Sequence, residues 1–459
     1  MLARSNLSYR PHGAERFARG RQQRGEQALT APNGGVRLAE LLGRLSLAFD
    51  IANDASYGEG VRSVVLAVEL GRLAGAASTE LHETFWLSLL GYLGCAGDTS
   101  IKLANIVGAG PRILSALTAS DSPALPARLV QLARAAEAAH QQHGQAGAVA
   151  RIRRQAGAEL DSRLAQVFVD RQRDLFTAIE DPRIFDRFLG LEPTPVASAD
   201  EHRVDDVARA LAIFADIRCP MFVGHSTGVA ALAERAAGQL GLGSDETRSL
   251  RRAALLHDIG RLGVPNSIWM RPGRLDWGDM ERVRLHAYYT ERVLSPIRIL
   301  GPVAEIAAAA HERLDGSGYS QNRIGRSLLS AARILAVADI AIAMSEARPY
   351  REPLSPDAIA QELVAEVSAG HVDAAAAEAV LASLGSKTRI VPRHASGVSE
   401  RELEVCRLIA HGKMNKEIAD VLGISLRTVQ NHVAHIFDKL GVHSRSGVAV
   451  WLVENDAVQ

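Results

Sequence analysis

The feature that most constrains this chain is a set of histidines and aspartates set in Ala- and Leu-rich helical sequence. The six positions are His225, His257, Asp258, His286, His311 and Asp339. A single histidine on an apolar helix face is usually a core residue. Six ionisable groups beside apolar faces would each be costly to bury unless they were paired or coordinated. Imidazole and carboxylate together suit manganese, iron, zinc or a similar divalent ion, so the pattern predicts a metal site.

The segments around these positions resemble the HD superfamily of metal-dependent phosphohydrolases, and its HD-GYP branch in particular. The motifs "HDIGRLGVPNSI", "HERLDGSGY" and "ARILAVADI" follow one another in the family's order, and the resemblance covers residues 205–385. It implies that Asp258 lies between two metals, with His286 and His311 on the second. The ligands that it implies for the first metal are His225, His257, Asp258 and Asp339.

The sequence departs from the family pattern at three positions. Ala310 stands where the family has the first of two histidines, Arg261 where it often has lysine, and Ser320 where it has the proline of GYP. The change at Ala310 leaves the second metal short of a protein donor, and two-metal hydrolysis depends on both ions. Arg261 keeps the positive charge but not the geometry of lysine.

Three interpretations of this domain follow. In the first, one or two ions support hydrolysis of a phosphoester such as cyclic di-GMP, with Asp258 as the bridging ligand and Arg261 stabilising charge on the phosphate. In the second, the pocket binds a metal or a nucleotide without turnover and controls a DNA-binding domain. In the third, the fold is only structural. The retained ligands argue against the third interpretation, and Ala310 argues against the first in its full form. We therefore expect the second, with the hydrolase as the alternative.

The last part of the chain, residues 398–459, has the pattern of a helix-turn-helix. Ser399 and Glu402 have capping-box spacing at the start of one helix, and Gly412 follows its end. A short helix and a Gly-containing turn then lead to Ser425, which is placed to cap the next helix.

This stretch closely resembles the LuxR-type helix-turn-helix domain, whose second helix enters the major groove of double-stranded DNA. The resemblance implies that Gln430, Asn431 and Ala434 face bases. The side chains that it places near phosphates are Lys416, Arg427, Thr428, His432 and Lys439. A single such domain makes few contacts, so we expect a homodimer on paired half-sites. The alternative is a helical domain that binds a protein partner through the same face.

Residues 36–175 have helical periodicity and look like a degenerate HD-like repeat. An offset of 166 in residue number (225 − 59) aligns their first helices with the central domain, and an offset of 205 (339 − 134) aligns a later helix. In this alignment His225 corresponds to Glu59, His257 to Gly91, Asp258 to Tyr92 and Asp339 to Arg134. A metal site cannot be assembled from these residues, so we expect packing, dimerisation or regulation.

Composition suggests the remaining boundaries. Residues 1–35 are rich in arginine and glutamine and predict a disordered basic tail, or else an arm that touches DNA phosphates. Residues 176–205 read as a connection, 206–385 as the HD-GYP-like domain and 386–397 as a flexible linker. The predicted fold class is all-α, with two HD-type helical domains in tandem and a small helix-turn-helix domain.

Charge and cysteine content set limits on function. The formal net charge is +0, so only a local patch can attract nucleic acid. The 3 cysteines lie far apart, which favours a reducing cytoplasm over a disulfide framework. No uncharged apolar run reaches the length of about eighteen residues that a membrane span needs, so we expect no membrane partner.

Overall fold

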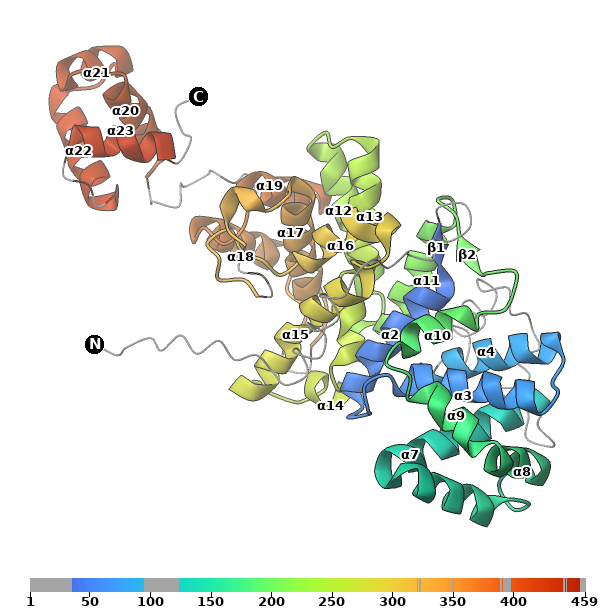
Figure 1. The fold of residues 1–459 in the computed structure, drawn as a ribbon. Helices are drawn as coiled ribbons and strands as arrows, with labels where there is room; N and C mark the ends of the chain where they lie inside the picture. Colours follow the sequence, from blue (N-terminus) through green and yellow to red (C-terminus); the bar gives the residue numbers. More distant parts are fainter. Residues whose placement is uncertain are drawn as a thin grey trace.

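The computed structural model describes residues 35–94, 124–319, 321, 323–348, 351–388, 390, 398–440, 442 and 444–454. Predictions for the tail (1–34), for most of the linker (391–397) and for Ser320 fall outside this range. The described chain is helical apart from one short antiparallel pair of strands, β1 (Val36–Arg37) and β2 (Ser198–Ala199) (Figure 1). The all-α prediction is therefore confirmed. No described helix combines the length and apolar character that a membrane span requires.

The N-terminal half is a bundle of helices beside the central half (Figure 1). Its helices are α2 (Leu38–Ala52), α3 (Glu59–Leu73), α4 (Ser78–Tyr92), α7 (Leu125–Gln155), α8 (Ser162–Asp170), α9 (Gln172–Ile179) and α10 (Ile184–Gly190). Helix α7 consists of two helical segments that meet at Gly144, where φ is +68°. This bundle buries aliphatic and aromatic side chains along α2, α3 and α4.

The central half holds the six predicted ligands. Its helices are α11 (Val204–Ile217), α12 (His225–Gln239), α13 (Ser244–Leu256), α14 (Asn266–Trp269), α15 (Trp277–Leu294), α16 (Gly301–Ala308), α17 (Ser330–Ser345), α18 (Pro356–Ser368) and α19 (Ala374–Ser383). Its short 3₁₀ turns are η2 (Pro220–Phe222), η3 (Ile259–Gly263), η4 (Arg298–Leu300) and η5 (Gly325–Ser327). One hydrophobic core runs through both halves, because α2 packs against η3 and α15.

The helices of the two halves begin at matching positions. Helices α2, α3 and α4 precede α11, α12 and α13 by one constant offset in residue number, since 204 − 38, 225 − 59 and 244 − 78 are all 166. Helix α7 precedes α17 by the other offset, 330 − 125 = 205. The glycines that precede α3 and α12, Gly58 and Gly224, both have a φ of +87°, a value that only glycine adopts readily. The two offsets are those found by aligning the sequence with itself.

Buried and capping carboxylates also recur in the two halves. Asp50 accepts hydrogen bonds from the backbone of Gly58 (2.7 Å) and Gly60 (3.4 Å). Asp216, its counterpart at the first offset, accepts from the backbone N–H of Ser226 (2.9 Å). Each carboxylate therefore ties the end of one helix to the start of the next. In addition, Asp161 and Asp373 cap α8 and α19, and each pairs with an arginine, Arg128 and Arg333 respectively.

Residues 176–205 differ from the predicted connection. They contain the end of α9, the whole of α10 and strand β2, which returns to pair with β1. The Phe188 ring of α10 is fully buried and stacks on Phe85 at 5.2 Å between centroids. Arg37 and Glu192 form a buried ion pair of 2.5 Å. The proline and serine content of this segment suggested a loop, so the apolar spacing of α10 was not recognised. The apolar side chains of α10 pack this segment against the N-terminal half.

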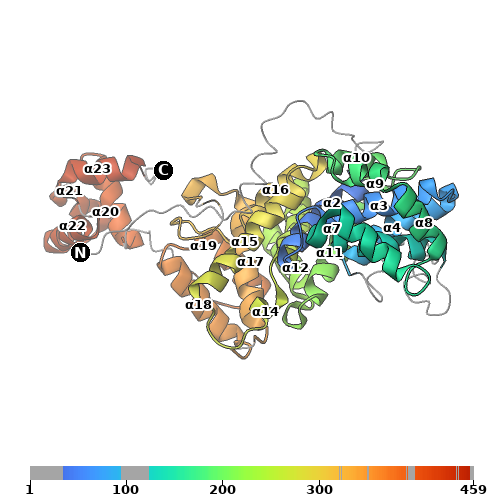
Figure 2. The same cartoon turned by 60° about the horizontal axis from the view of Figure 1, so that its bottom comes forward.

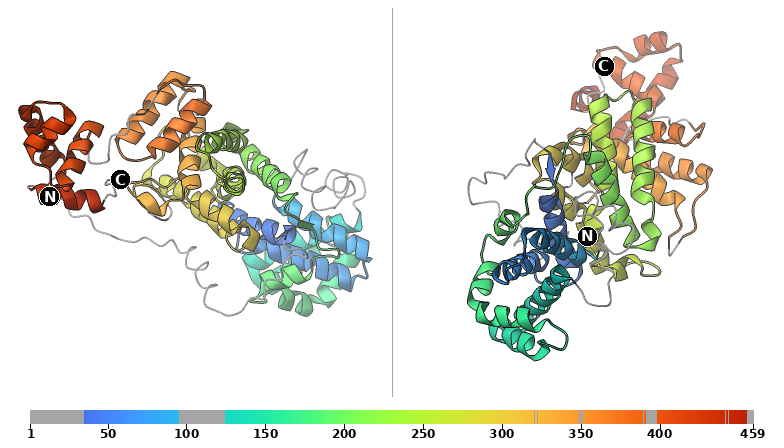
Figure 3. Two further views of the ribbon diagram at one scale, coloured as in Figure 1. Left: turned by 90° about the horizontal axis from the view of Figure 1, so that it is seen from above. Right: turned by 90° about the vertical axis from the view of Figure 1, so that its right-hand side faces the viewer.

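The C-terminal helices form a separate domain with a core of its own, set apart from the two halves in Figures 2 and 3. They are α20 (Glu400–Ala410), α21 (Asn415–Leu422), α22 (Leu426–Leu440) and α23 (Arg445–Glu454). The predicted capping box of Ser399 and Glu402 is present. Gly423 turns α21 toward α22 with a φ of +63°, and Ser425 Oγ accepts from the Thr428 N–H (3.1 Å).

Candidate metal centre

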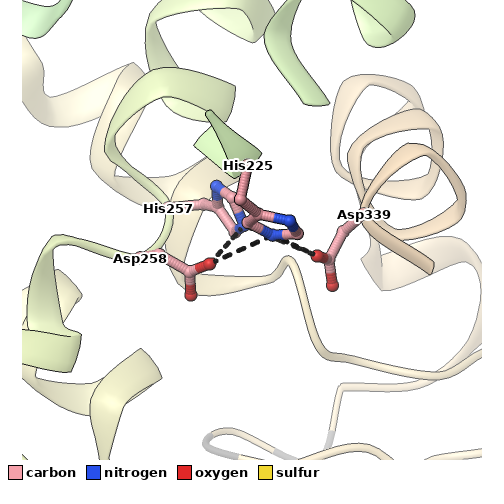
Figure 4. Close-up of side chains that lie close together, drawn as sticks. All are labelled: His225, His257, Asp258 and Asp339. Carbon is pink, nitrogen blue, oxygen red and sulfur yellow. Dashed lines mark hydrogen bonds and ion pairs between the residues drawn. The ribbon is translucent and has the colours of Figure 1, made fainter. Parts of the chain in front are cut away.

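Four of the predicted ligands meet where α12, α13 and α17 converge (Figure 4). His225 is the first residue of α12, His257 and Asp258 follow the last residue of α13, and Asp339 projects from α17. One potential ligand atom from each residue lies within 4.8 Å of the others, and all four side chains are buried. The structure thus brings together residues that are up to 114 positions apart.

His257 and Asp258 lie in the turn between α13 and η3, called the HD turn below. A glycine and a hydroxyl group hold this turn against α15. A Cβ at Gly260 would lie 2.0 Å from the carbonyl oxygen of His286, so only glycine fits there. The Gly260 N–H donates to Thr290 Oγ1 (3.0 Å), and that hydroxyl donates to the His257 carbonyl (2.8 Å). This contact fixes the position of His286 on α15 relative to Asp258 on the turn.

Asp258 also belongs to a second group of donors. Its Oδ1 lies 3.1 Å from His286 Nε2 and 3.7 Å from His311 Nε2. Its Oδ2 lies 2.8 Å from His257 Nε2 and 3.5 Å from His225 Nε2. The carboxylate therefore stands between two sets of imidazoles, which is the arrangement that a bridging ligand requires.

Backbone and carboxylate acceptors orient the imidazoles. His257 Nδ1 donates to the Ala254 carbonyl (2.8 Å) and His286 Nδ1 to the Val283 carbonyl (2.5 Å). His225 Nδ1 donates to Glu346 Oε2 (2.9 Å). With the proton on Nδ1, the Nε2 lone pair of each ring points to the centre of the cluster. Such outer hydrogen bonds are typical of histidines that ligate metal.

The donor set fits a divalent cation. His286 Nε2 and His311 Nε2 are 2.7 Å apart, a distance at which two lone pairs need a proton or a metal between them. His257 Nε2 and both Asp258 carboxylate oxygens are buried and make no hydrogen bond of good geometry among the described residues, although His257 and Arg261 lie within ion-pair distance of Asp258 Oδ2. Buried acceptors of this kind are costly without a cation. Nitrogen and carboxylate donors in this number suit manganese, iron or zinc.

Electrostatics within the cluster agree with this fit. Burial would raise the pKa of Asp258 and Asp339, but other groups outweigh it and hold both well below the usual value. These groups are Arg261 and neighbouring histidines for Asp258, and histidines alone for Asp339. Burial would lower the pKa of His225 and His257, but the two carboxylates raise it to about 10 and about 9. Both buried carboxylates are therefore held in the charged form, which attracts positive charge to this point of the fold.

The second group lacks one donor, as the sequence predicts. Ala310 is buried, at 1% exposure, and its methyl group offers no ligand atom. Burial and the neighbouring His286 lower the pKa of His311 to about 4, so its ring is neutral. The Tyr319 ring stacks on His311 at 4.9 Å between centroids. The second group thus has Asp258, His286 and His311, with an aromatic wall beside them.

Arg261 lies on the far side of Asp258 from the second group. Its Nη2 contacts Asp258 Oδ2, and its guanidinium lies 3.7 Å from the centroid of the Phe222 ring. Its Nε and Nη1 are buried and have no hydrogen-bond partner in the part of the chain that the structure describes. The structure shows that Arg261 pairs with Asp258. The phosphate contact predicted for Arg261 stays a prediction.

Sequence reasoning missed three residues that support the cluster. Glu346 receives the Nδ1 proton of His225, and it also pairs with Arg348 at 2.8 Å. Thr290 bridges the HD turn and α15, and Tyr319 stacks on His311. Only Tyr319 lay in a recognised motif. Glu346 follows α17 at no diagnostic spacing, and threonine in a helix carries no signal.

The predicted DNA-facing residues lie on α21 and α22. The exposed ones are Lys416, Arg427, Gln430, Asn431, Ala434 and Lys439, and the half-buried ones are Thr428 and His432. The opposite sides of these helices carry Ile418, Val429 and Ile436, which are buried in the core of the domain. Lys439 Nζ bonds Glu402 Oε2 (2.6 Å), which ties α22 to α20. This ion pair competes with the phosphate contact predicted for Lys439.

Comparison with known families agrees with both motifs. Residues 209–376 match the family model of the HD domain, and residues 396–452 match that of the bacterial regulatory proteins of the luxR family. The chain combines an HD domain with a LuxR-family helix-turn-helix. The expectation drawn from the motifs is therefore confirmed at the level of the two domains.

Several curated phosphodiesterases are similar to the HD part of the chain. A 3′3′-cGAMP-specific phosphodiesterase of Vibrio cholerae is 35% identical over 214 residues, which are 46% of this chain and 46% of that protein. A cyclic di-GMP phosphodiesterase response regulator of Xanthomonas campestris is 36% identical over 188 residues, 39% of this chain and 49% of that protein. The chain spans less than half the length of these relatives.

A solved structure extends the likeness in fold beyond the HD domain. The crystal structure of a cyclic GMP-AMP specific phosphodiesterase of V. cholerae superposes with a TM-score of 0.56 at 23% identity. It covers 77% of this chain and 98% of that chain, which is far more than residues 209–376. The arrangement of the N-terminal helices is therefore shared as well.

Proposed function

We propose that this protein is a DNA-binding transcriptional regulator whose HD domain binds a divalent metal, manganese, iron or similar, and through it a cyclic dinucleotide or related phosphoester. The observation that carries the metal proposal is the group of buried imidazole and carboxylate donors that converge on Asp258. The LuxR-family helices supply the DNA-binding part. The relatives named above act on cyclic dinucleotides, which supports that ligand class for this chain.

The residues of the cluster would divide the work as follows. His225, His257, Asp258 and Asp339 would hold the first ion, and Asp258 would share a second ion with His286 and His311. A bound divalent ion would supply Lewis acidity toward a phosphate oxygen. Asp258 keeps the two donor groups at a fixed separation, and Arg261 lowers the charge that Asp258 presents.

Binding of metal is tested by dialysing the purified full-length protein against Mn²⁺ and measuring the metal content. We expect at least one ion per chain in the wild type and a large loss in His257→Ala. Equal metal content in the two proteins, both folded by circular dichroism, would rule out the cluster as the metal site.

DNA binding is tested by gel shift on a promoter library. We expect Asn431→Ala to weaken selected sites by about tenfold, because one base contact is worth roughly 1 to 3 kcal/mol. Asp420→Ala, an exposed change on α21, serves as the control. A wild type that shifts no DNA would favour a protein partner for this face, and unchanged binding in Asn431→Ala would mean that Asn431 contacts no base. Because the domain alone makes few contacts, we further propose that the regulator binds as a homodimer in the cytoplasm.

The second candidate is a metal-dependent phosphodiesterase with a regulatory DNA-binding domain. The placement of Asp258 between two donor groups favours it, because a bridged pair of ions is the arrangement used in metal-assisted phosphoester hydrolysis. Turnover of cyclic di-GMP or 3′3′-cGAMP by Mn²⁺- or Fe²⁺-loaded protein, abolished in His257→Ala, would establish it. A protein that keeps its metal without turnover would instead be a sensor.

We propose that residues 36–175 are a degenerate HD repeat that has kept the fold and lost the ligands. The two constant offsets between helix starts and the recurring Asp50/Asp216 bonds support this origin. Its role would be to pack against the metal-binding half.

A further inference from the structure

The two groups of donors differ in how far solvent reaches them. In the first group, the imidazoles of His225 and His257 are completely buried. In the second group, the side chain of His286 is 2% exposed and that of His311 is 12% exposed. Asp339, at 10% exposure, lies with its Oδ2 3.4 Å from His311 Nδ1. The cluster is therefore open to solution beside His311, on the side of the second group.

The second group has three protein donors among the described residues. They are Asp258 Oδ1, His286 Nε2 and His311 Nε2. The neighbouring carboxylate of Glu312 is buried and not available, because its oxygens accept the backbone N–H groups of Gln321 (2.7 Å) and Arg323 (3.0 Å). Manganese and iron commonly take more than three ligands, so molecules from solution have to supply the others.

An aromatic ring and an exposed cation lie beside the open side of His311. The Tyr319 ring stacks on His311, and burial raises the pKa of its phenol, so the hydroxyl stays protonated and adds no negative charge. The Arg284 guanidinium lies 5.9 Å from the centroid of the same ring, and it also pairs with Glu281 at 2.8 Å. Aromatic faces and arginine are surfaces on which nucleobases and phosphate groups bind.

The balance of charge differs between the two groups. Asp258 and Asp339 offer the first ion two carboxylates, both held in the charged form. The second group shares Asp258 and adds only the imidazoles of His286 and His311, with no further carboxylate among the described residues. Two divalent ions on either side of one carboxylate repel each other. A second ion is therefore favoured only when an anion comes with it.

We propose that the second group binds a divalent ion together with a phosphate-bearing ligand, whose oxygen replaces the donor that Ala310 lacks. The ion and the ligand strengthen each other's binding, because a coupling free energy between two ligands is reciprocal. The first group binds its ion without this ligand. The HD domain thus responds to metal and phosphate ligand in combination. This inference rests on the proposed function, to which it adds the dependence of the second ion on the ligand.

The test is equilibrium dialysis of the full-length protein against Mn²⁺, with bound metal measured by mass spectrometry at equal free Mn²⁺. The dialysis is repeated with GMP, with inorganic phosphate, and with guanosine, which has the base of GMP without its phosphate. We expect wild type alone to bind the first ion. GMP should raise the affinity for a second ion by about tenfold, and guanosine should have no effect.

Two variants locate the effect at the second group. Ala310→His supplies the missing imidazole and should bind the second ion without GMP, so that GMP raises its affinity less than in wild type. His286→Ala removes a donor of the second group only and should keep the first ion while binding no second ion with or without GMP. Circular dichroism checks that both variants fold, and the wild-type comparison decides the question if either does not.

A wild type that binds only the first ion under every condition would overturn the proposal, and so would a second ion bound equally with and without GMP or phosphate. An effect of guanosine equal to that of GMP would also overturn it. A stronger effect of GMP than of phosphate supports it and assigns the ligand to nucleotides, whereas an equal or weaker one assigns it to free phosphate. Failure to bind even the first ion would contradict the proposed function itself.

Discussion

The N-terminal and central halves of this protein share the spacing of their first three helices, yet among the described residues only the central half assembles a cluster of side chains that could hold a metal. In the central half, His257 and Asp258 end α13 and face His225. In the N-terminal half, Tyr92 stands at the position of Asp258, and its hydroxyl donates to Asp50 (2.6 Å). The fold therefore needs the glycine turns and the buried carboxylates at the helix starts. It does not need the ligands, whose presence in one half calls for a functional explanation.

The largest effect is expected from removing the residue shared by both donor groups. Asp258→Asn should weaken Mn²⁺ binding by more than about 100-fold. Residues that only hydrogen-bond to a metal ligand contribute roughly 10- to 100-fold, and a ligand shared by two ions should contribute more. The matched change in the other half, Tyr92→Phe, should leave metal affinity unchanged. Calorimetric titration with Mn²⁺ measures both. An effect of Tyr92→Phe as large as that of Asp258→Asn would erase the distinction between the halves.

The next effect concerns the orientation of His225, which has only Glu59 at its position in the N-terminal half. Glu346→Ala removes the acceptor of the His225 Nδ1 proton and should weaken metal binding by about 10- to 100-fold. Glu346→Gln keeps an acceptor oxygen and should lie between this variant and wild type. The exposed Glu352→Ala provides the control. Unchanged affinity in Glu346→Ala would mean that packing alone orients the ring.

A smaller effect should come from restoring the missing donor. Ala310→His places an imidazole beside His311 and should raise the affinity for a second ion by about tenfold. Ala310→Leu is the control, because it adds a side chain of comparable size that has no ligand atom. It shows how much of any change comes from strain in this buried position rather than from coordination. The number of Mn²⁺ ions per chain, measured at increasing free metal, distinguishes the two. If both variants bind the same number, the side chain at 310 does not reach the second group.

The last prediction concerns stability rather than metal affinity, and it tests the feature that both halves share. Burial raises the pKa of Asp50 to about 6, against the hydrogen bonds from Tyr92 and Gly58 that lower it. The protonated carboxyl is therefore favoured in the folded state. Its stabilisation is fully present below about pH 3.8 and is lost as the pH rises through about 6.

Between pH 4 and pH 7 the free energy of unfolding of wild type should therefore fall by about 2 to 3 kcal/mol relative to Asp50→Asn. Urea titrations across this range, followed by circular dichroism, measure the difference. A constant difference between the two proteins would mean that Asp50 stays charged in the fold.

Much of this protein was predictable from local pattern. The helical spacing of apolar residues and the glycines between these segments predicted the all-α fold. Both signals depend only on residues that are close together in the sequence. The six ligands were recognised from motif order, and the structure brings them together. The capping box at Ser399 and Glu402 followed from spacing alone.

Other features depended on contacts between distant segments. No local pattern shows that Glu346 reaches His225 across 121 positions, or that α10 returns to stack Phe188 on Phe85. Likewise, motifs suggested a phosphate-facing Lys439, but packing of α22 on α20 pairs it with Glu402. The chain's sequence determined its helices and turns and indicated its candidate metal ligands, because these depend on neighbouring residues and local motifs. Tertiary packing decided which of these side chains converge in one buried cluster and which ion pairs they form there, because burial and charge pairing arise only when remote helices meet.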